Sequence, residues 1–167
     1  MDKLTMRRLT YEEQMERIKN DGYELRYVNV NNHTEEMCLE AVKNCGWALE
    51  FVENPTEEMC LEAVKNSGDA LAYIKNPTEE MCMIAVKNDG IALQYIEYPT
   101  EEMCMIAVKN DGWVLQYIKY PTKEMCMIAV KNDGLVLQHV SPEFLKDDLK
   151  EIDYNHPLDN FKENENE

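Results

Sequence analysis

A unit of 22 residues recurs five times in this chain almost without change. Each copy contains a Thr-x-Glu-Met-Cys string, an Ala-Val-Lys-Asn string and a glycine at fixed positions. The copies run from Asn32 to Glu53, Asn54 to Lys75, Asn76 to Glu97, Tyr98 to Lys119 and Tyr120 to Ser141. A fixed period of this length is typical of a solenoid, in which each unit buries its apolar face only against its neighbours. The repetition therefore predicts an elongated stack of units.

Each unit reads as two short helices joined at a glycine. In the second full unit, Thr56 is a suitable N-cap for a helix from Glu57 to Asn66, with acidic residues in its first turn and a lysine in its last. We expect Gly68 to adopt the left-handed conformation that often ends a helix. A second helix is expected from Asp69 to Ile74. The predicted fold class is therefore all-α: an α-solenoid of two-helix repeats with N- and C-terminal caps.

A degraded copy of the unit precedes the five full ones and aligns with them through Gly22. Its first helix carries Glu13, Gln14 and Arg17 where later units carry Met, Cys and Ala. These substitutions predict a hydrophilic outer face, which is typical of a repeat that caps the end of a solenoid.

The other end of the repeat array is followed by a helix start at Ser141-Pro142-Glu143 and an apolar stripe that begins at Phe144. This helix is expected to close the stack, and the Glu- and Asn-rich end of the chain has too little apolar content to fold. The predicted organisation is an N-terminal arm at 1–7, a capping repeat at 8–31, five repeats at 32–141, a capping helix at 142–155 and an acidic disordered tail at 156–167.

One cysteine occupies the same position in every full unit: Cys38, Cys60, Cys82, Cys104 and Cys126. Stacked helices place such positions about 10 Å apart, whereas a disulfide tolerates Cα separations of only about 7 Å. We therefore expect five buried free thiols. A metal ladder is disfavoured because the paired Cys or His spacing of zinc sites is missing. Cys45, which stands before a glycine, is predicted to be exposed.

The sequence contains no pattern that indicates an enzyme. The histidines His33, His139 and His156 are scattered, and no phosphate-binding loop, nucleophile elbow or zinc-protease motif is present. Carboxylate pairs such as Glu57 and Glu58 recur in every unit, which favours a role in the scaffold. We expect a non-enzymatic protein without a metal or cofactor.

The position after each glycine varies more than any other: Tyr23, Trp47, Asp69, Ile91, Trp113 and Leu135. We call this column the post-glycine ridge. Aromatic and large apolar residues gathered on an exposed surface are typical of protein interfaces. The ridge residues of the full units, Trp47, Asp69, Ile91, Trp113 and Leu135, are therefore the predicted protein-binding site. The alternative is that these side chains fold back between the helices.

A second variable column changes from acidic to apolar along the chain: Glu40, Glu62, Ile84, Ile106 and Ile128.

The net charge of −16 disfavours direct binding to nucleic acids, which proteins bind through clusters of Lys and Arg. The one lysine per unit, such as Lys65, is explained by its position at a helix C-terminus. An acidic rod suits a basic protein partner. The alternative function is an acidic decoy or inhibitor that imitates a nucleic acid and occupies a host or defence nucleic-acid-binding protein.

The string from Asn54 to Ile74, Asn-Pro-Thr-Glu-Glu-Met-Cys-Leu-Glu-Ala-Val-Lys-Asn-x-Gly-x-Ala-Leu-x-Tyr-Ile, resembles 22-residue helical repeats of uncharacterised proteins in giant DNA viruses of amoebae and in some bacteria. The resemblance extends from Arg8 to about Ser141. It implies the helical repeat fold and little about function, because the repeat family has none assigned.

No apolar run approaches the roughly 20 residues that span a bilayer, and the first residues lack the apolar stretch of a signal peptide. We therefore expect a cytoplasmic protein without a membrane partner. The sequence leaves the oligomeric state open.

Overall fold

The computed structural model describes residues 3–140 and Phe144. Within these residues every regular element is a helix, and ten-residue α-helices alternate with six-residue 3-10 helices. The paired elements are α2 (Tyr11–Asn20) and η1 (Gly22–Tyr27), α3 (Glu35–Asn44) and η3 (Gly46–Phe51), α4 (Glu57–Asn66) and η4 (Gly68–Tyr73), α5 (Glu79–Asn88) and η5 (Gly90–Tyr95), α6 (Glu101–Asn110) and η6 (Gly112–Tyr117), and α7 (Lys123–Asn132) and η7 (Gly134–His139). The short helices α1 (Lys3–Met6) and η2 (Val30–Asn32) interrupt this alternation.

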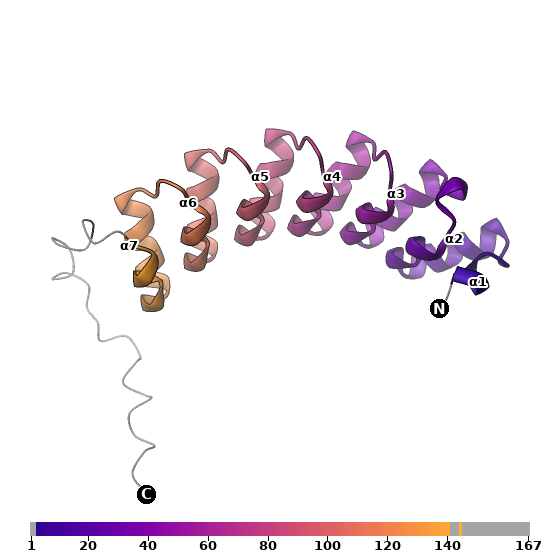
Figure 1. Ribbon diagram of the computed structural model, residues 1–167, viewed down its shortest axis with the longest axis horizontal. Helices are drawn as coiled ribbons and strands as arrows, with labels where there is room; N and C mark the ends of the chain where they lie inside the picture. Colours follow the sequence, from indigo (N-terminus) through magenta and orange to yellow (C-terminus); the bar gives the residue numbers. More distant parts are fainter. Residues whose placement is uncertain (1–2, 141–143, 145–167) are drawn as a thin grey trace, which may run out of the picture.

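The units lie side by side in chain order and form an arch, with the loops between units along its outer edge (Figure 1). Each α-helix from α3 to α6 packs against its own 3-10 helix, against the 3-10 helix of the preceding unit and against the α-helices on both sides. The 3-10 helices also contact one another, so the arch has two layers. The predicted all-α solenoid is confirmed.

The α-helices begin and end where the sequence predicts. The Oγ1 atom of Thr56 accepts a hydrogen bond from the backbone N–H of Met59 at 3.3 Å and caps α4. Glu57 and Glu58 lie in the first turn and Lys65 in the last, where they complement the helix dipole. Capping threonines at the equivalent positions start the α-helices of all the other full units.

The second element of each unit differs from the predicted helix in type and register. The expected helix from Asp69 to Ile74 is instead a 3-10 helix that begins at Gly68 and ends at Tyr73. Residues three apart superpose in a 3-10 helix, so Gly68 and Leu71 share one face, and both are buried. Six residues in this tighter helix suffice to bury the glycine and the leucine against the α-helices.

The prediction of a left-handed glycine was wrong. No glycine in the described part of the chain has a positive φ, and α4 is followed by the C-cap residue Ser67, whose backbone is extended. The glycine is required by a close approach between units. A Cβ atom added to Gly68 would lie 2.7 Å from the carbonyl oxygen of Ala85, and one added to Gly46 would lie 2.5 Å from that of Ala63. Both distances are too short for two non-bonded atoms.

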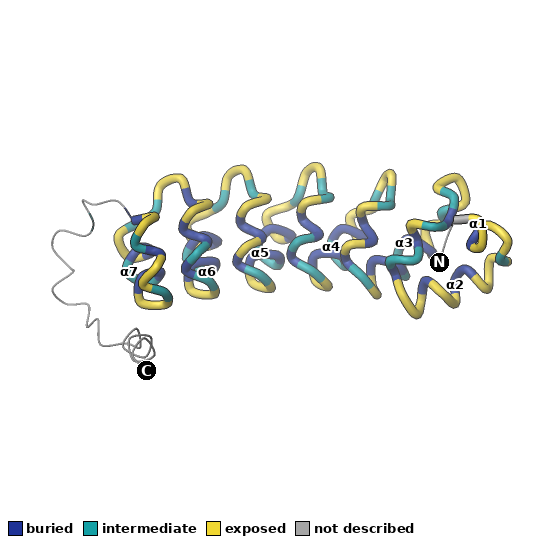
Figure 2. Tube along the Cα trace, turned by 60° about the horizontal axis from the view of Figure 1, so that its bottom comes forward, coloured by how far each residue is buried: buried dark blue, intermediate teal, exposed yellow. Residues whose placement is uncertain are grey.

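The core runs along the arch between the two layers, and Figure 2 shows buried residues in the middle of each unit with exposed residues at the turns. In the third full unit the buried side chains are Met81, Cys82, Ala85, Val86, Ala92 and Leu93. Met83 and Ile84 of the same α-helix are only half-buried. The composition of the apolar run predicts a helix that is covered by protein on every side. The structure differs, because one side of the helix faces outward.

The N-terminal unit carries a cover that its sequence did not indicate. Glu13 and Arg17 are exposed as expected, but Gln14 is buried. Its Nε2 atom donates a hydrogen bond to the backbone carbonyl of Met6 at 2.9 Å, and Met6 is fully buried. Helix α1 therefore covers part of the face that was predicted to be hydrophilic.

The predicted capping helix at 142–155 and the tail at 156–167 lie outside the described residues, apart from Phe144. The side chain of Phe144 is partly buried against the core. No helix in the described ranges is long and apolar enough to cross a membrane.

The cysteine ladder is buried and its thiols are free, as predicted. Cys45 was expected to be exposed and is half-buried. The reason is the tight contact between units, because a Cβ atom on Gly22 would lie only 3.1 Å from the Cβ atom of Cys45. Cys45 and Ser67 are therefore held close to the glycine of the preceding unit.

Candidate functional site

The post-glycine ridge lies on the layer of 3-10 helices. Three of its members are exposed: Trp47 at 41%, Ile91 at 38% and Leu135 at 63% of their surface. Tyr23, Asp69 and Trp113 are half-buried. The expected exposure is therefore found at three positions. At the other three, the side chains are partly packed against the molecule, as in the alternative.

The aromatic ridge residues lie next to the unit that follows them. The ring of Trp47 meets the ring of Tyr73 edge to face, with centroids 6.1 Å apart. The same arrangement joins Tyr23 to Phe51 at 5.1 Å and Trp113 to His139 at 5.8 Å. The second member of each pair occupies the last position of a 3-10 helix, which we call the aromatic slot: Tyr27, Phe51, Tyr73, Tyr95, Tyr117 and His139.

The ridge and the aromatic slot together form a stripe across successive units. Tyr95 and Tyr117 are exposed at 39% and 41%, so the stripe continues between the paired rings. Sequence reasoning identified the ridge but missed its pairing with the slot. The aromatic residue that recurs four positions after the ridge was a signal for the slot. The repeat period alone did not indicate that a ridge residue contacts the slot of the next unit.

The two tryptophans have different surroundings. The indole Nε1 of Trp113 donates a hydrogen bond to Oδ2 of Asp133 at 2.8 Å, and the other oxygen of Asp133 accepts from the backbone N–H of Leu135. The position equivalent to Asp133 in the unit that follows Trp47 is Ser67. Trp47 therefore lacks this anchor and is the more exposed of the two.

Negative charge surrounds the tyrosines in the middle of the stripe. Desolvation raises the pKa of Tyr73 above its usual value, and the charges of Glu50 and Asp69 raise it further. The pKa of Tyr95 is also raised, first by desolvation and then by the charge of Asp69. Asp69 therefore lies close enough to both tyrosines to place an acidic group on an otherwise aromatic surface.

The first unit contains a cation on the same surface. The guanidinium of Arg26 lies 4.7 Å from the ring centroid of Tyr23 and 4.4 Å from that of Tyr27, and it also bonds to the Tyr27 hydroxyl. Cations bind aromatic faces at such distances. Later units carry uncharged or acidic residues at the position of Arg26: Glu50, Ala72, Gln94, Gln116 and Gln138.

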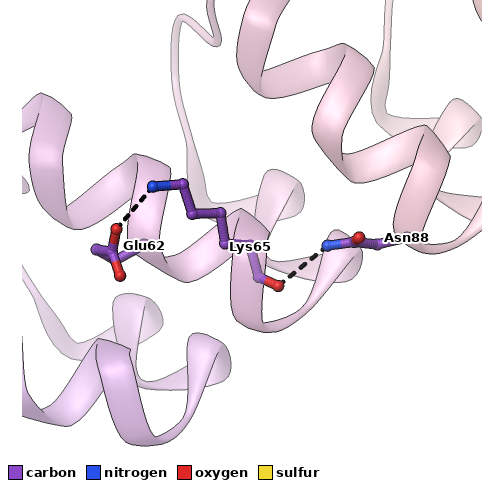
Figure 3. A network of polar contacts seen from close by, with 3 residues as sticks. All are labelled: Glu62, Lys65 and Asn88. Carbon is purple, nitrogen blue, oxygen red and sulfur yellow. Dashed lines mark hydrogen bonds and ion pairs between the residues drawn. The ribbon is translucent and has the colours of Figure 1, made fainter.

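An asparagine ladder holds the units behind the ridge, and sequence reasoning missed it. The side-chain Nδ2 of Asn66 donates to the carbonyl of Lys43 at 3.1 Å, while its Oδ1 accepts from the backbone N–H of Gly46 at 2.8 Å. Figure 3 shows the next step, in which Asn88 donates to the carbonyl of Lys65 at 3.1 Å. The ladder consists of Asn44, Asn66, Asn88, Asn110 and Asn132. Its signal in the sequence is the asparagine that ends every α-helix.

The outward side of the α-helices carries the second variable column. All five of its members are half-buried, so the isoleucines of the later units are no more deeply buried than the glutamates of the first two. The carboxylate of Glu62 accepts from the ammonium of Lys65 at 2.9 Å (Figure 3). This exposed pair contributes little to stability.

A pocket of about 300 Å³ is lined by the first two full units and by Val30, which precedes them. Its lining includes His33, Cys38, Val52 and Met59. Desolvation lowers the pKa of His33, which favours the neutral imidazole at this site. Across residues 3–140 there is no group of three or more His, Cys, Asp or Glu residues arranged to hold a metal ion.

The repeats match a protein family. The profile described as Domain of unknown function (DUF4116) matches three overlapping segments, 34–77, 56–99 and 78–121. Each segment covers two successive units, and together they span more than half of the chain. Searches of curated proteins and of solved structures returned no match. The buried glycine, the helix-capping threonine and the ladder asparagine all recur within the matched segments, and the chain belongs to the family of this domain of unknown function.

Proposed function

We propose that this protein is a non-enzymatic scaffold that binds another protein through the post-glycine ridge. The observation that supports this function is the stripe itself, in which large apolar and aromatic side chains from separate units lie next to one another with part of their surface exposed. Such residues are enriched where proteins bind each other.

The pattern of variation supports the same function. Positions that join neighbouring units repeat almost unchanged, such as Gly68 and Asn66, because each makes a contact that any substitution would disturb. The ridge beside them contains tryptophan, aspartate, isoleucine and leucine. A constant frame with a variable surface suits recognition of one particular partner.

A comparison of two baits tests the proposal. One carries Trp47→Ser, Ile91→Ser and Leu135→Ser on the ridge. The other carries Glu58→Ser, Glu80→Ser and Glu102→Ser, three exposed positions in the first turns of the α-helices. We expect a partner that is retained by the wild-type chain and by the control bait but lost from the ridge bait. A partner retained equally by all three would contradict a role for the ridge.

The acidic decoy is the second candidate. It is supported by exposed carboxylate pairs at the start of successive α-helices: Glu35 and Glu36, Glu57 and Glu58, Glu79 and Glu80, and Glu101 and Glu102. Attraction between charges weakens steeply as salt rises, whereas contact between apolar groups does not. Partner release between about 0.1 and 1 M salt favours the decoy. Retention over this range favours the ridge.

A further inference from the structure

The rings of Trp47 and Tyr73 form an open corner on the stripe. Their planes meet at 66° with centroids 6.1 Å apart, so they present two walls at a steep angle. Trp47 is exposed over 41% of its surface. The residue next to Tyr73 on the exposed side of η4 is Ala72, whose methyl group is too small to fill the corner.

Two carboxylates lie beside this corner. Asp69 precedes Ala72 on η4, and Glu50 lies near the end of η3. Glu50 follows Trp47 by three residues and so shares its face of the 3-10 helix, and Asp69 precedes Tyr73 by four residues on η4. After desolvation, both charges also raise the pKa of Tyr73. The corner therefore combines aromatic walls with negative charge, and no cationic side chain of the described chain is found over its rings.

The other two ring pairs in the described residues differ from this one. The pair of Tyr23 and Phe51 has Arg26 over one of its rings. In the pair of Trp113 and His139, the indole N–H is already bonded to Asp133. Of the three, only the corner of Trp47 and Tyr73 combines an exposed tryptophan with no cation over its rings and no carboxylate bonded to its indole N–H.

Arg26 shows what such a surface binds. Its guanidinium contacts the rings of Tyr23 and Tyr27, which occupy the ridge and slot positions of the first unit. A planar guanidinium stacks on aromatic rings and also donates hydrogen bonds to carboxylates, a combination that the ammonium of lysine matches less well. The corner of Trp47 and Tyr73 also brings a ridge ring and a slot ring together, but from two successive units, and it has carboxylates nearby.

We propose that this corner binds an arginine side chain from a basic segment of the protein partner. The inference rests on the proposed function and adds the chemistry of the partner. The rings of Trp47 and Tyr73 contact the faces of the guanidinium, and the carboxylates of Glu50 and Asp69 accept its N–H groups. The net charge of −16 draws basic segments toward the arch.

A fluorescence titration tests the proposal directly. The chain has two tryptophans, so Trp113→Phe leaves Trp47 as the reporter. The probes are a capped peptide, Gly-Arg-Gly-Arg-Gly, and the same peptide with citrulline, which keeps the shape of arginine without its charge. We expect the arginine peptide to bind at least about fivefold more tightly than the citrulline peptide, a ratio within the range of a cation on an aromatic ring. Equal affinities would overturn the proposal.

Matched variants separate a local site from general charge. Asp69→Asn and Glu50→Gln are each expected to weaken binding of the arginine peptide about threefold, within the strength of one partly exposed ion pair. Glu102→Gln changes the net charge by the same amount far from the corner and is expected to have no effect. An equal loss in all three variants would show nonspecific attraction and overturn the proposal.

A second readout covers the case in which Trp113→Phe is poorly folded. Full-length protein labelled with 5-fluorotryptophan gives one fluorine resonance for each tryptophan, and the arginine peptide is expected to shift that of Trp47. A shift confined to Trp113 would overturn the proposal.

If arginine is not preferred while the ridge bait still loses its partner, the arginine site fails and the proposed function stands. If arginine is preferred while all baits retain the same partners, the proposed function fails instead.

Discussion

A Cβ atom on Gly68 would lie 2.7 Å from the carbonyl oxygen of Ala85, which lies on α5 of the next unit. Gly68→Ala must therefore push η4 and α5 apart. We expect the substitution to lower the free energy of unfolding by about 1–3 kcal/mol, the usual cost of overpacking. Urea denaturation followed by circular dichroism measures this loss.

Gly134 provides the control for that experiment. It occupies the same position in the last repeat, but a Cβ atom there would meet no atom of the described residues within 4 Å. Its φ is not positive, so alanine fits the backbone. Gly134→Ala is expected to change stability by less than about 0.5 kcal/mol or to raise it slightly. Equal losses at the two glycines would disprove the close-packing explanation.

The asparagine ladder makes a second prediction. Asn66→Ala removes the acceptor for the N–H of Gly46 and the donor to the carbonyl of Lys43. Leaving a part-buried N–H without a partner costs about 1–3 kcal/mol. Asn20 ends α2, is exposed and has no preceding repeat to bond, so Asn20→Ala is the control. We expect thermal melting to detect the first substitution and not the second.

The two tryptophans are expected to respond differently to truncation. Trp113→Ala removes a half-buried ring and its hydrogen bond to Asp133, which predicts a loss of about 2–3 kcal/mol. Trp47→Ala removes a more exposed ring and is expected to cost about 1 kcal/mol or less. With Trp47 alone, emission should lie at a longer wavelength and be quenched more strongly by iodide than with Trp113 alone. The reverse order would contradict the described exposures.

The thiols are expected to react at two rates. Burial raises the pKa of all five ladder cysteines, including Cys60 and Cys82, so their reactive thiolate form is disfavoured. Cys45 is half-buried and should react first with a thiol reagent in the native protein. Cys45→Ser should remove the fast phase and leave the slow one. More than one fast thiol per chain would show that the ladder is accessible.

The pocket histidine predicts a dependence of stability on pH. Desolvation holds the pKa of His33 in the folded protein below the unfolded value of 6.5. The unfolded chain therefore takes up this proton more readily, and the stabilising effect is complete above pH 6.5 and falls as the pH drops below it. Melting temperatures between pH 7.5 and 5.5 should fall more for the wild type than for His33→Gln. Parallel curves would exclude His33 as the source.

The α-helices of the full units were predictable to the residue because their boundaries depend on local signals. Thr56 bonds to the backbone three residues later, and the residues that end the helix lie within one turn of it. These signals need no knowledge of the neighbouring unit. The burial of the cysteines followed equally well from the regular spacing of one small apolar residue per unit.

The role of the glycines could not be predicted in the same way. Gly68 after a helix is compatible with both a left-handed ending and a close contact, and only the position of Ala85 in the next unit distinguishes them. The pairing of Trp47 with Tyr73 and the bond from Trp113 to Asp133 likewise join separate units. Each depends on how far one unit is rotated against the next, and a repeat period carries no information on that rotation.

The bonds of the asparagine ladder connect each unit only to the one before it, and every full unit brings the same asparagine. An arch joined in this way is insensitive to how many units it contains. Recombination between the nearly identical coding repeats would add or remove 22 residues and preserve each junction. The same event would place different ridge residues side by side, so a change in length would also be a change in what the surface recognises.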